Sequence, residues 1–165
     1  MNKNLKKTTY TGLFAALIFV LTLFLHVPVA SGYVHFGDAM LYICAVLLGN
    51  PYALIAGALG EGLADVAGGF AIYAPATVLI KIAIGVVFAF AKNDKKLLTI
   101  KSALFTLPAG IITVGGYFLA DCLIDKTYAL VDIPGNVIQT VGSAVIFIVV
   151  AFAMDKTHLR DQLKL

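Results

Sequence analysis

The chain has 165 residues, of which 61% are hydrophobic and only 13% are charged, and its formal net charge is +3. Soluble domains contain about 45–50% apolar and about 25% charged residues, and the mean hydropathy here is +0.96. The composition therefore excludes an ordinary soluble domain and predicts an all-α integral membrane protein with several spans. The basic residues gather near one membrane face, which excludes a nucleic-acid-binding patch.

Six apolar segments are candidates for transmembrane helices, which need about 17–25 residues each. The first is longer and more uniform than the apolar part of a signal peptide and precedes no convincing cleavage site, so we expect it to be retained. No linker or repeat divides the segments, and we expect a single domain over residues 1–165. The predicted helices cover residues 9–27, 36–49, 51–68, 74–91, 102–120 and 134–154.

Proline residues mark the ends of several of these helices. Pro28 ends the first helix, and the second reaches membrane depth only if it is extended from about Tyr33 onward. Pro51 is expected at the first position of the third helix. The fifth helix is open to disturbance at residues 108–110, and residues 121–132 are expected to form a polar connection.

The distribution of basic residues gives the expected orientation. With six spans, both chain ends and the 92–101 loop share one side, which carries ten basic residues, whereas the other side carries only Lys126. Cytoplasmic loops are enriched in Lys and Arg, so both termini are predicted to be cytoplasmic. The ten residues are Lys3, Lys6, Lys7, Lys92, Lys95, Lys96, Lys101, Lys156, Arg160 and Lys164.

Three ionisable residues lie inside predicted spans, Glu61 and Asp65 in the third and Lys81 in the fourth. A charge at a helix centre costs at least about 2.5–3.5 kcal/mol, so such residues are usually paired or face a polar cavity. Glu61 and Asp65 are four residues apart and share a helix face. At about 1.5 Å per residue, Glu61 and Lys81 both lie roughly 10 Å below the outer surface. They can form a purely structural ion pair or share a ligand.

Further polar side chains are predicted to reach the same outer cavity from the first loop and from the second, fifth and sixth helices. These candidates are His35, Asp38, Tyr42, Tyr117, Asn136 and Gln139. Asp38 and Asn136 can instead cap their helices, and Asp121 and Asp125 can be solvated loop charges. The convergence of polar groups from several segments in the outer half favours a binding site.

A patch of small residues lies in the cytoplasmic half of the first helix, at Gly12, Ala15 and Ala16. Small residues let helix backbones approach closely. The patch is therefore predicted to contact a partner protein, with packing inside the bundle as the alternative.

The sequence carries no signature of an enzyme or a metalloprotein. Cys44 and Cys122 lie in or beside apolar runs and are expected to be small buried residues. No spacing typical of metal ligands, or of a nucleophile with its base, is present. We therefore predict no catalytic residue, no metal and no cofactor in this chain.

Five stretches taken together resemble one transporter family over nearly the full length of the chain. They are His35-Phe-Gly-Asp38, Gly57-Ala-Leu-Gly-Glu-Gly-Leu-Ala-Asp65, Pro75-Ala-Thr-Val-Leu-Ile-Lys81, Gly116-Tyr117 and Pro134-Gly-Asn-Val-Ile-Gln139. The family consists of the substrate-binding S components of energy-coupling factor (ECF) vitamin transporters. The resemblance points to the branch that contains riboflavin, pyridoxine and hydroxymethylpyrimidine carriers.

The resemblance implies a six-helix protein of the bacterial plasma membrane that binds a vitamin-like solute in an outward pocket under its first loop. It also implies delivery through a transmembrane coupling protein and two ATPases, since no Walker A motif is present in this chain. The family's contact with the coupling protein is an Ala-x-x-x-Ala motif on the first helix. Here the corresponding candidate is Gly12-x-x-x-Ala16.

The polar residues narrow the substrate class. The chain contains no Trp, so Tyr and Phe must do any stacking. A mixture of acids, a base and amides suits a small polar heteroaromatic, with pyridoxine or hydroxymethylpyrimidine ahead of riboflavin, pantothenate or a queuosine precursor. The main alternative function is a non-transporting membrane scaffold or assembly subunit whose buried charges hold helices together, followed by a small intramembrane enzyme.

Overall fold

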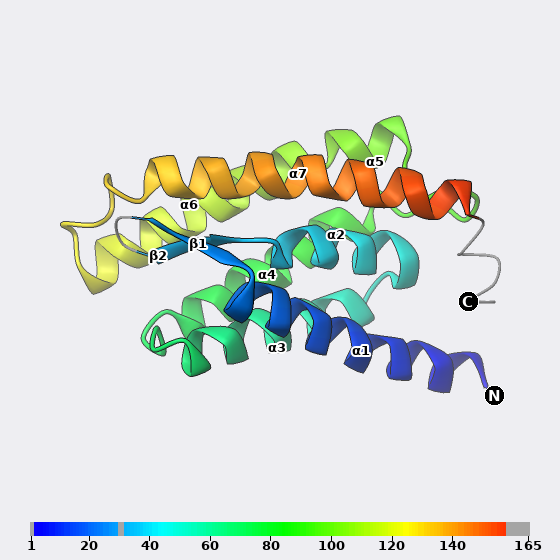
Figure 1. Ribbon diagram of the computed structural model, residues 1–165, viewed down its shortest axis with the longest axis horizontal. Coiled ribbons are helices and arrows are strands. Elements are labelled where there is room, and N and C mark those ends of the chain that lie inside the picture. The colour runs from blue at the N-terminus through cyan, green and yellow to red at the C-terminus, as the bar shows by residue number, and fades with distance from the viewer. Residues whose placement is uncertain (1, 30–31, 158–165) are drawn as a thin grey trace.

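The computed structural model describes residues 2–29 and 32–157, and nearly all of its regular structure is helical (Figure 1). The helical fold class is therefore confirmed, with a short β-hairpin that the hydropathy pattern did not indicate. The elements are α1 (Lys3–Phe24), β1 (His26–Val29), β2 (Gly32–His35), α2 (Gly37–Leu48), α3 (Tyr52–Ala67), α4 (Ala74–Ala89), α5 (Ile100–Leu104), α6 (Thr106–Ile124) and α7 (Ile133–Lys156).

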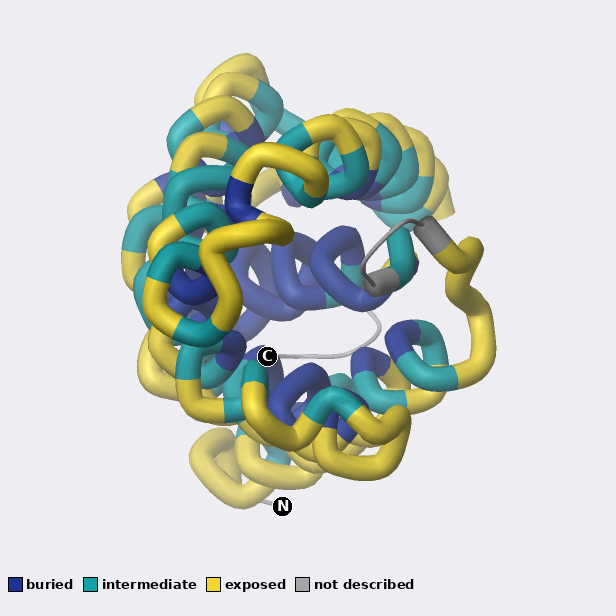
Figure 2. The backbone as a smooth tube through the Cα atoms, turned by 90° about the vertical axis from the view of Figure 1, so that its left-hand side faces the viewer, coloured by how far each residue is buried: buried dark blue, intermediate teal, exposed yellow. Residues whose placement is uncertain are grey.

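Helix α2 is the axis of the bundle. Apart from Met40, every residue of this helix is buried, and α1, α3, α4 and α7 all pack against it. In the end-on view, its buried turns lie at the centre of the ring formed by the other helices (Figure 2). A helix enclosed on all sides is expected to be apolar all round, and Asp38 is the one charged residue in the α2 sequence.

The hairpin corrects the predicted boundary between the first two helices. Helix α1 ends at Phe24 instead of reaching residue 27, and Pro28 lies in β1, where it pairs with Tyr33. Proline is tolerated there because this two-stranded sheet has free edges. Strand β2 then leads through Phe36 into α2. The 12-residue helix α2 is about 18 Å long and the four residues of β2 add about 13 Å, so a strand supplies the depth that a longer helix was expected to provide.

The predicted fifth helix is interrupted earlier than expected. It begins at Ile100, where Thr99 and Ser102 form a capping box, and it breaks at Phe105 rather than at residues 108–110. Proline lacks an N–H and clashes with the carbonyl four residues before it. For Pro108 that carbonyl belongs to Leu104, the last residue of α5, which accounts for the position of the break. The helix then runs to Ile124, so the polar connection begins four residues later than predicted.

The outer surface of the bundle is apolar. Exposed leucine, isoleucine and valine side chains cover it from α1 to α7, which is the surface expected to face lipid. Three segments of the described chain, Lys3–Phe24, Ile100–Ile124 and Ile133–Lys156, are long and apolar enough to cross a membrane. Helices α2 and α4 are apolar but shorter.

The first and last described helices bring both ends of the described chain to one end of the bundle, while the hairpin and the α6–α7 loop lie at the other (Figure 1). Lys3, Lys6, Lys7 and Lys156 belong to those helix ends. Arg160 and Lys164, which contributed to the predicted orientation, lie outside the described residues.

Candidate binding site

A polar cavity lies at the hairpin end of the bundle. It occupies about 90 Å³ and is walled by β2, α3, α6, α7 and the loops that precede α4 and α7. The lining residues are Tyr33, His35, Asp65, Phe70, Tyr73, Tyr117, Asp121, Asp132, Gly135, Asn136 and Gln139. Below, this set is called the pocket.

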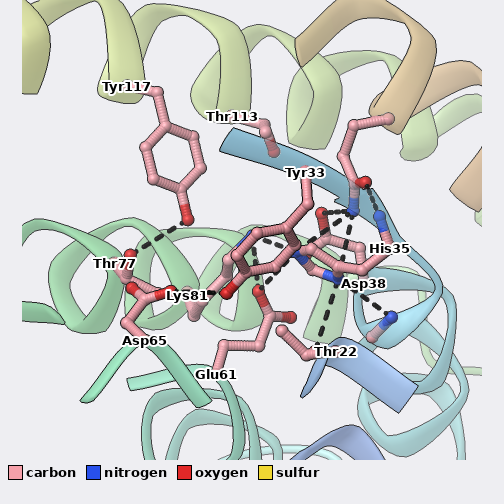
Figure 3. A network of polar contacts seen from close by, with 12 residues as sticks. Thr22, Tyr33, His35, Asp38, Glu61, Asp65, Thr77, Lys81, Thr113 and Tyr117 are labelled. Carbon is pink, nitrogen blue, oxygen red and sulfur yellow. Dashed lines mark hydrogen bonds and ion pairs between the residues drawn. The ribbon is translucent and has the colours of Figure 1, made fainter. Parts of the chain in front are cut away.

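Aromatic side chains form one part of the pocket wall. The Tyr33 ring lies edge-on to Phe70 with 5.3 Å between centroids, and its hydroxyl donates to Asp65 Oδ1 at 3.1 Å. The Tyr73 hydroxyl donates to Asp121 Oδ1 at 2.9 Å. The Tyr117 hydroxyl is 3.1 Å from Thr77 Oγ1 (Figure 3). Three tyrosines are thus held in place by hydrogen bonds from their hydroxyl groups.

Three carboxyl groups also face the pocket, and each has one oxygen without a hydrogen-bond partner. These oxygens are Asp65 Oδ2, Asp121 Oδ2 and Asp132 Oδ1. Asp65 is only 8% exposed and Asp121 only 1%. The alternative that Asp121 is a solvated loop charge is therefore excluded, because α6 extends past it and buries it, whereas Asp125 is exposed, as that alternative requires. We call these three residues the pocket carboxylates.

Asp132 lies outside the membrane-embedded helices, immediately before α7. Partial burial, together with the nearby Asp121 carboxylate, raises the pKa of Asp132 to about 6. Its side chain makes no capping hydrogen bond to α7. A carboxyl group that is neither paired nor used as a cap is free to meet a ligand.

His35 and Gln139 form the floor of the pocket. The backbone N–H of His35 donates to Gln139 Oε1 at 2.5 Å, and Gln139 Nε2 donates to Asp38 Oδ2 at 3.1 Å. The backbone N–H of Gly37 donates to His35 Nδ1 at 3.1 Å. Because Nδ1 is an acceptor, a neutral ring carries its proton on Nε2, which lies 3.6 Å from Glu61 Oε2.

Beneath this floor lies a buried charged cluster of Asp38, Glu61 and Lys81 (Figure 3). Lys81 Nζ is 2.7 Å from Asp38 Oδ1 and 2.9 Å from Glu61 Oε2, and all three side chains are at most 1% exposed. The ion pair between Glu61 and Lys81 that their equal depth made reasonable is present. Helices α2, α3 and α4 each supply one member, so the cluster ties the central helix to two of its neighbours. Asp38 does not cap α2, since the cap position is Phe36.

Below the charged cluster the interior becomes aromatic. Tyr42 stacks on Phe88 with 4.4 Å between ring centroids, and Phe147 meets both rings edge-on. Tyr42 is fully buried, and its hydroxyl has no hydrogen-bond partner. The structure therefore places this predicted site residue in the core and away from the pocket lining.

The predicted site residues thus separate into layers. The pocket is lined by His35, Asp65, Tyr117, Asn136 and Gln139, while the charged cluster lies beneath it. Asn136 does not cap α7, whose cap position is Asp132. The sequence did not predict Phe70, Tyr73 and Asp132 as pocket residues. They lie in or next to loops, where helical periodicity does not indicate which way a side chain points.

The three small residues of α1 that were predicted to contact a partner lie in different environments. Gly60 of α3 lies so close to α1 that an added Cβ would be 2.8 Å from the Ala15 carbonyl oxygen, and Ala15 packs against the core. Ala16 is exposed, and an added Cβ at Gly12 would meet nothing within 4 Å. Ala15 therefore belongs to the bundle interior, whereas Gly12 and Ala16 face outward.

Comparison with known proteins identifies one family and one relative. The family described as "ECF-type riboflavin transporter, S component" matches residues 2–156. A relative from Pyrococcus woesei, described as an uncharacterized protein in gap 3'region, is 34% identical over 122 residues. The matched region covers 73% of this chain and 80% of that relative.

Proposed function

The chain belongs to the family of ECF-type riboflavin transporter S components, and from this premise we propose that it is the substrate-binding subunit of an ATP-driven importer. The observation that carries the proposal is the pocket, in which polar and aromatic side chains from four elements and two loops converge at one end of an otherwise apolar bundle. A scaffold subunit would need the charged cluster beneath the pocket, but it would not need the open carboxylates in its wall.

In this proposal, the pocket residues and the charged cluster have different tasks. His35, Asp65, Tyr117, Asn136 and Gln139 contact the solute, because they line the cavity. The charged cluster holds Asp38, and Asp38 in turn fixes the amide of Gln139. Lys81 and Glu61 therefore act by positioning the pocket floor.

The solute we propose is a small vitamin-like heteroaromatic, with pyridoxine or hydroxymethylpyrimidine favoured over riboflavin, pantothenate or a queuosine precursor. Pockets for small molecules usually measure about 300–1,000 Å³, whereas this cavity holds about 90 Å³. The wall must therefore widen to admit even a single-ring solute. Because Tyr33 and His35 come from β2, an outward movement of the hairpin would open the pocket directly.

The membrane arrangement we propose has six spans, with both termini in the cytoplasm and the pocket facing outward. The start of α1 and the end of α7 lie at the end of the bundle opposite the hairpin, as an even number of crossings requires (Figure 1). The bacterial plasma membrane is the expected location. An external signal from a reporter fused to the C-terminus would contradict this topology.

Partners are needed to complete the transport cycle, and we propose a transmembrane coupling subunit and two ATPases. Gly12 and Ala16 offer an outward-facing small-xxx-small pair on α1, which lets a partner helix approach closely. Ala16→Leu is expected to leave solute binding by the isolated protein intact and to abolish ATP-driven uptake by the assembled complex. The readouts are solute binding by the purified protein and uptake into proteoliposomes.

Ala15→Leu is the matched control on the neighbouring position of the same helix. Since Ala15 packs against the core beside Gly60, a leucine there is expected to impair folding and therefore both readouts. Normal uptake by the Ala16→Leu complex would show that this face of α1 is not the contact with the coupling subunit.

The function itself is tested by mass spectrometry of small molecules that co-purify with the protein in detergent. The expected result is a heteroaromatic present at about one molecule per chain. A protein that is folded, carries no small molecule and binds none of the candidate vitamins would instead support the scaffold alternative.

A further inference from the structure

The pocket wall is acidic. Asp65, Asp121 and Asp132 all line it, and no lysine or arginine is among the described residues that do. Lys81 does not supply the missing charge, because it already lies within 3 Å of both Asp38 and Glu61 beneath the floor. Apart from His35, the described wall therefore has no basic side chain beside its three carboxyl groups.

The carboxylate oxygens that have no hydrogen-bond partner indicate that the wall lacks hydrogen-bond donors for them. Asp121 is 99% buried, at 1% exposure, and its Oδ1 accepts from Tyr73 while its Oδ2 has no partner. Asp65 repeats this arrangement, with Oδ1 accepting from Tyr33 and Oδ2 without a partner. Burial of an ionised group is costly unless it is paired and hydrogen-bonded. Each residue thus has one oxygen held in position and one left for a hydrogen-bond donor.

Aromatic rings stand beside these oxygens. Tyr33, Phe70, Tyr73 and Tyr117 share the wall with the three carboxylates. The face of an aromatic ring attracts a cation within about 6 Å and also stacks on a flat ring. Carboxylates combined with aromatic faces therefore favour an organic cation with a planar body over a hydrated metal ion, which needs oxygen ligands on several sides.

We propose that the solute is a positively charged, amine-bearing heteroaromatic, whose ammonium group is bound by Asp121 and Asp132 and whose ring stacks among the tyrosines. This inference rests on the proposed function and changes the favoured solute from the alcohols pyridoxine and hydroxymethylpyrimidine to their amine counterparts. It favours the amine form of a vitamin over the corresponding alcohol, and it disfavours neutral riboflavin and anionic pantothenate.

The test is isothermal titration of the purified protein in detergent with two probes of nearly the same shape. Pyridoxamine carries an aminomethyl group where pyridoxine carries a hydroxymethyl group, and the aminomethyl and hydroxymethyl forms of the same aminopyrimidine make a second pair. Hydrogen bonds to charged groups are about twice as strong as neutral ones. We expect the amine to bind at least about tenfold more tightly than the alcohol in the pair that fits.

Two substitutions assign this preference to the pocket. In Asp121→Asn, and separately in Asp132→Asn, the preference for the amine should fall to less than about threefold. Asp125→Asn is the matched control, because Asp125 is an exposed carboxylate close to both residues in sequence that does not line the pocket. It should keep the full preference. Two pocket variants are used so that a folding defect in one does not decide the result.

The remaining outcomes separate this inference from the proposed function. The inference is overturned if the amine and the alcohol bind with equal affinity, or if riboflavin or pantothenate binds more tightly than the amine. It is also overturned if calcium chloride alone displaces the amine with the same potency as the amine itself. In each case the proposed transporter function is unaffected. A co-purified molecule that is neutral or anionic at pH 7 would have the same consequence. If no probe binds and nothing co-purifies, the proposed function fails, and this inference fails with it.

Discussion

The charged cluster and the pocket carboxylates are neighbours, but their carboxyl groups have different partners. In the cluster, the Lys81 ammonium is within 3 Å of the carboxylates of Asp38 and Glu61, and all three side chains are buried. In the pocket, none of the described residues forms an ion pair with Asp65, Asp121 or Asp132, and each keeps an oxygen without a hydrogen-bond partner. Glu61 also has an oxygen without a hydrogen-bond partner, but Lys81 balances its charge. A buried carboxylate is thus a structural element where the described protein supplies its cation, and a candidate ligand contact where it does not.

The position of each group along the bundle explains this difference. The cluster is assembled from the central helix α2 and two packed neighbours, so its members are held by three rigid helices. The pocket carboxylates lie near helix ends, beside loops and the hairpin. Ion pairing between packed helices suits a positioning role, whereas carboxylates that line a cavity suit ligand binding.

Removal of the cluster's positive charge should have the largest effect on stability. Lys81→Met leaves Asp38 and Glu61 buried without their ammonium partner, and loss of one partner of a buried pair costs about 3–5 kcal/mol. We expect a correspondingly lower free energy of unfolding, measured by denaturant or thermal unfolding in one detergent.

Asp121→Asn is the contrasting variant, because the asparagine can still accept from Tyr73 and loses only an oxygen that has no partner. Its free energy of unfolding without ligand should change by less than about 1 kcal/mol. If Lys81→Met proved as mild as Asp121→Asn, the distinction between paired and open charges would fail.

A smaller effect is expected from pH, through Asp132. Its pKa is raised from 3.8 to about 6 in the folded protein, where it faces Asp121 of α6 and Tyr73 of the segment before α4. Between these values the folded state binds more protons than the unfolded state, so this residue lowers stability as pH rises from about 4 to 6. Unfolding temperatures measured without ligand should show this slope, and it should be reduced in Asp132→Asn. An identical slope in that variant would mean that Asp132 does not titrate in this range.

The smallest effect should come from Tyr42, which lies below both groups. Tyr42→Phe removes a buried hydroxyl that has no hydrogen-bond partner and keeps the stacking on Phe88. Removal of an unsatisfied polar group is neutral or slightly stabilising. We expect unchanged solute affinity and a free energy of unfolding within about 1 kcal/mol of the original. A marked loss of affinity would show that Tyr42 belongs to the binding site, as the sequence predicted.

Hydropathy and proline positions predicted the helices well, because long apolar runs and helix-breaking residues act locally. The hairpin was missed, although Val27, Val29 and Val34 alternate with other residues and flank Pro28 and Gly32, a pattern typical of short strands. A segment this short beside apolar helices gives a weak signal. Residues 25–27 were therefore predicted to continue the first helix.

The sequence predicted half of the site for physical reasons that can be named. Glu61 and Lys81 lie on adjacent antiparallel helices, so equal depth was enough to bring them together. The contact of Lys81 with Asp38 depends on α2 occupying the centre of the bundle, which no local pattern reveals. The burial of Asp121 likewise depends on how far α6 extends past the predicted helix end.

The most direct test of the central claim, that the pocket beneath the hairpin binds the solute, uses tryptophan fluorescence. The chain has no Trp, so a single substitution provides a unique reporter. Phe70→Trp places the reporter in the pocket wall, and Phe90→Trp places it at an exposed position that does not line the pocket. During titration with pyridoxamine, we predict a saturable emission change in Phe70→Trp and none in Phe90→Trp. Binding detected by calorimetry with no change in Phe70→Trp would contradict the account, because the solute would then bind elsewhere.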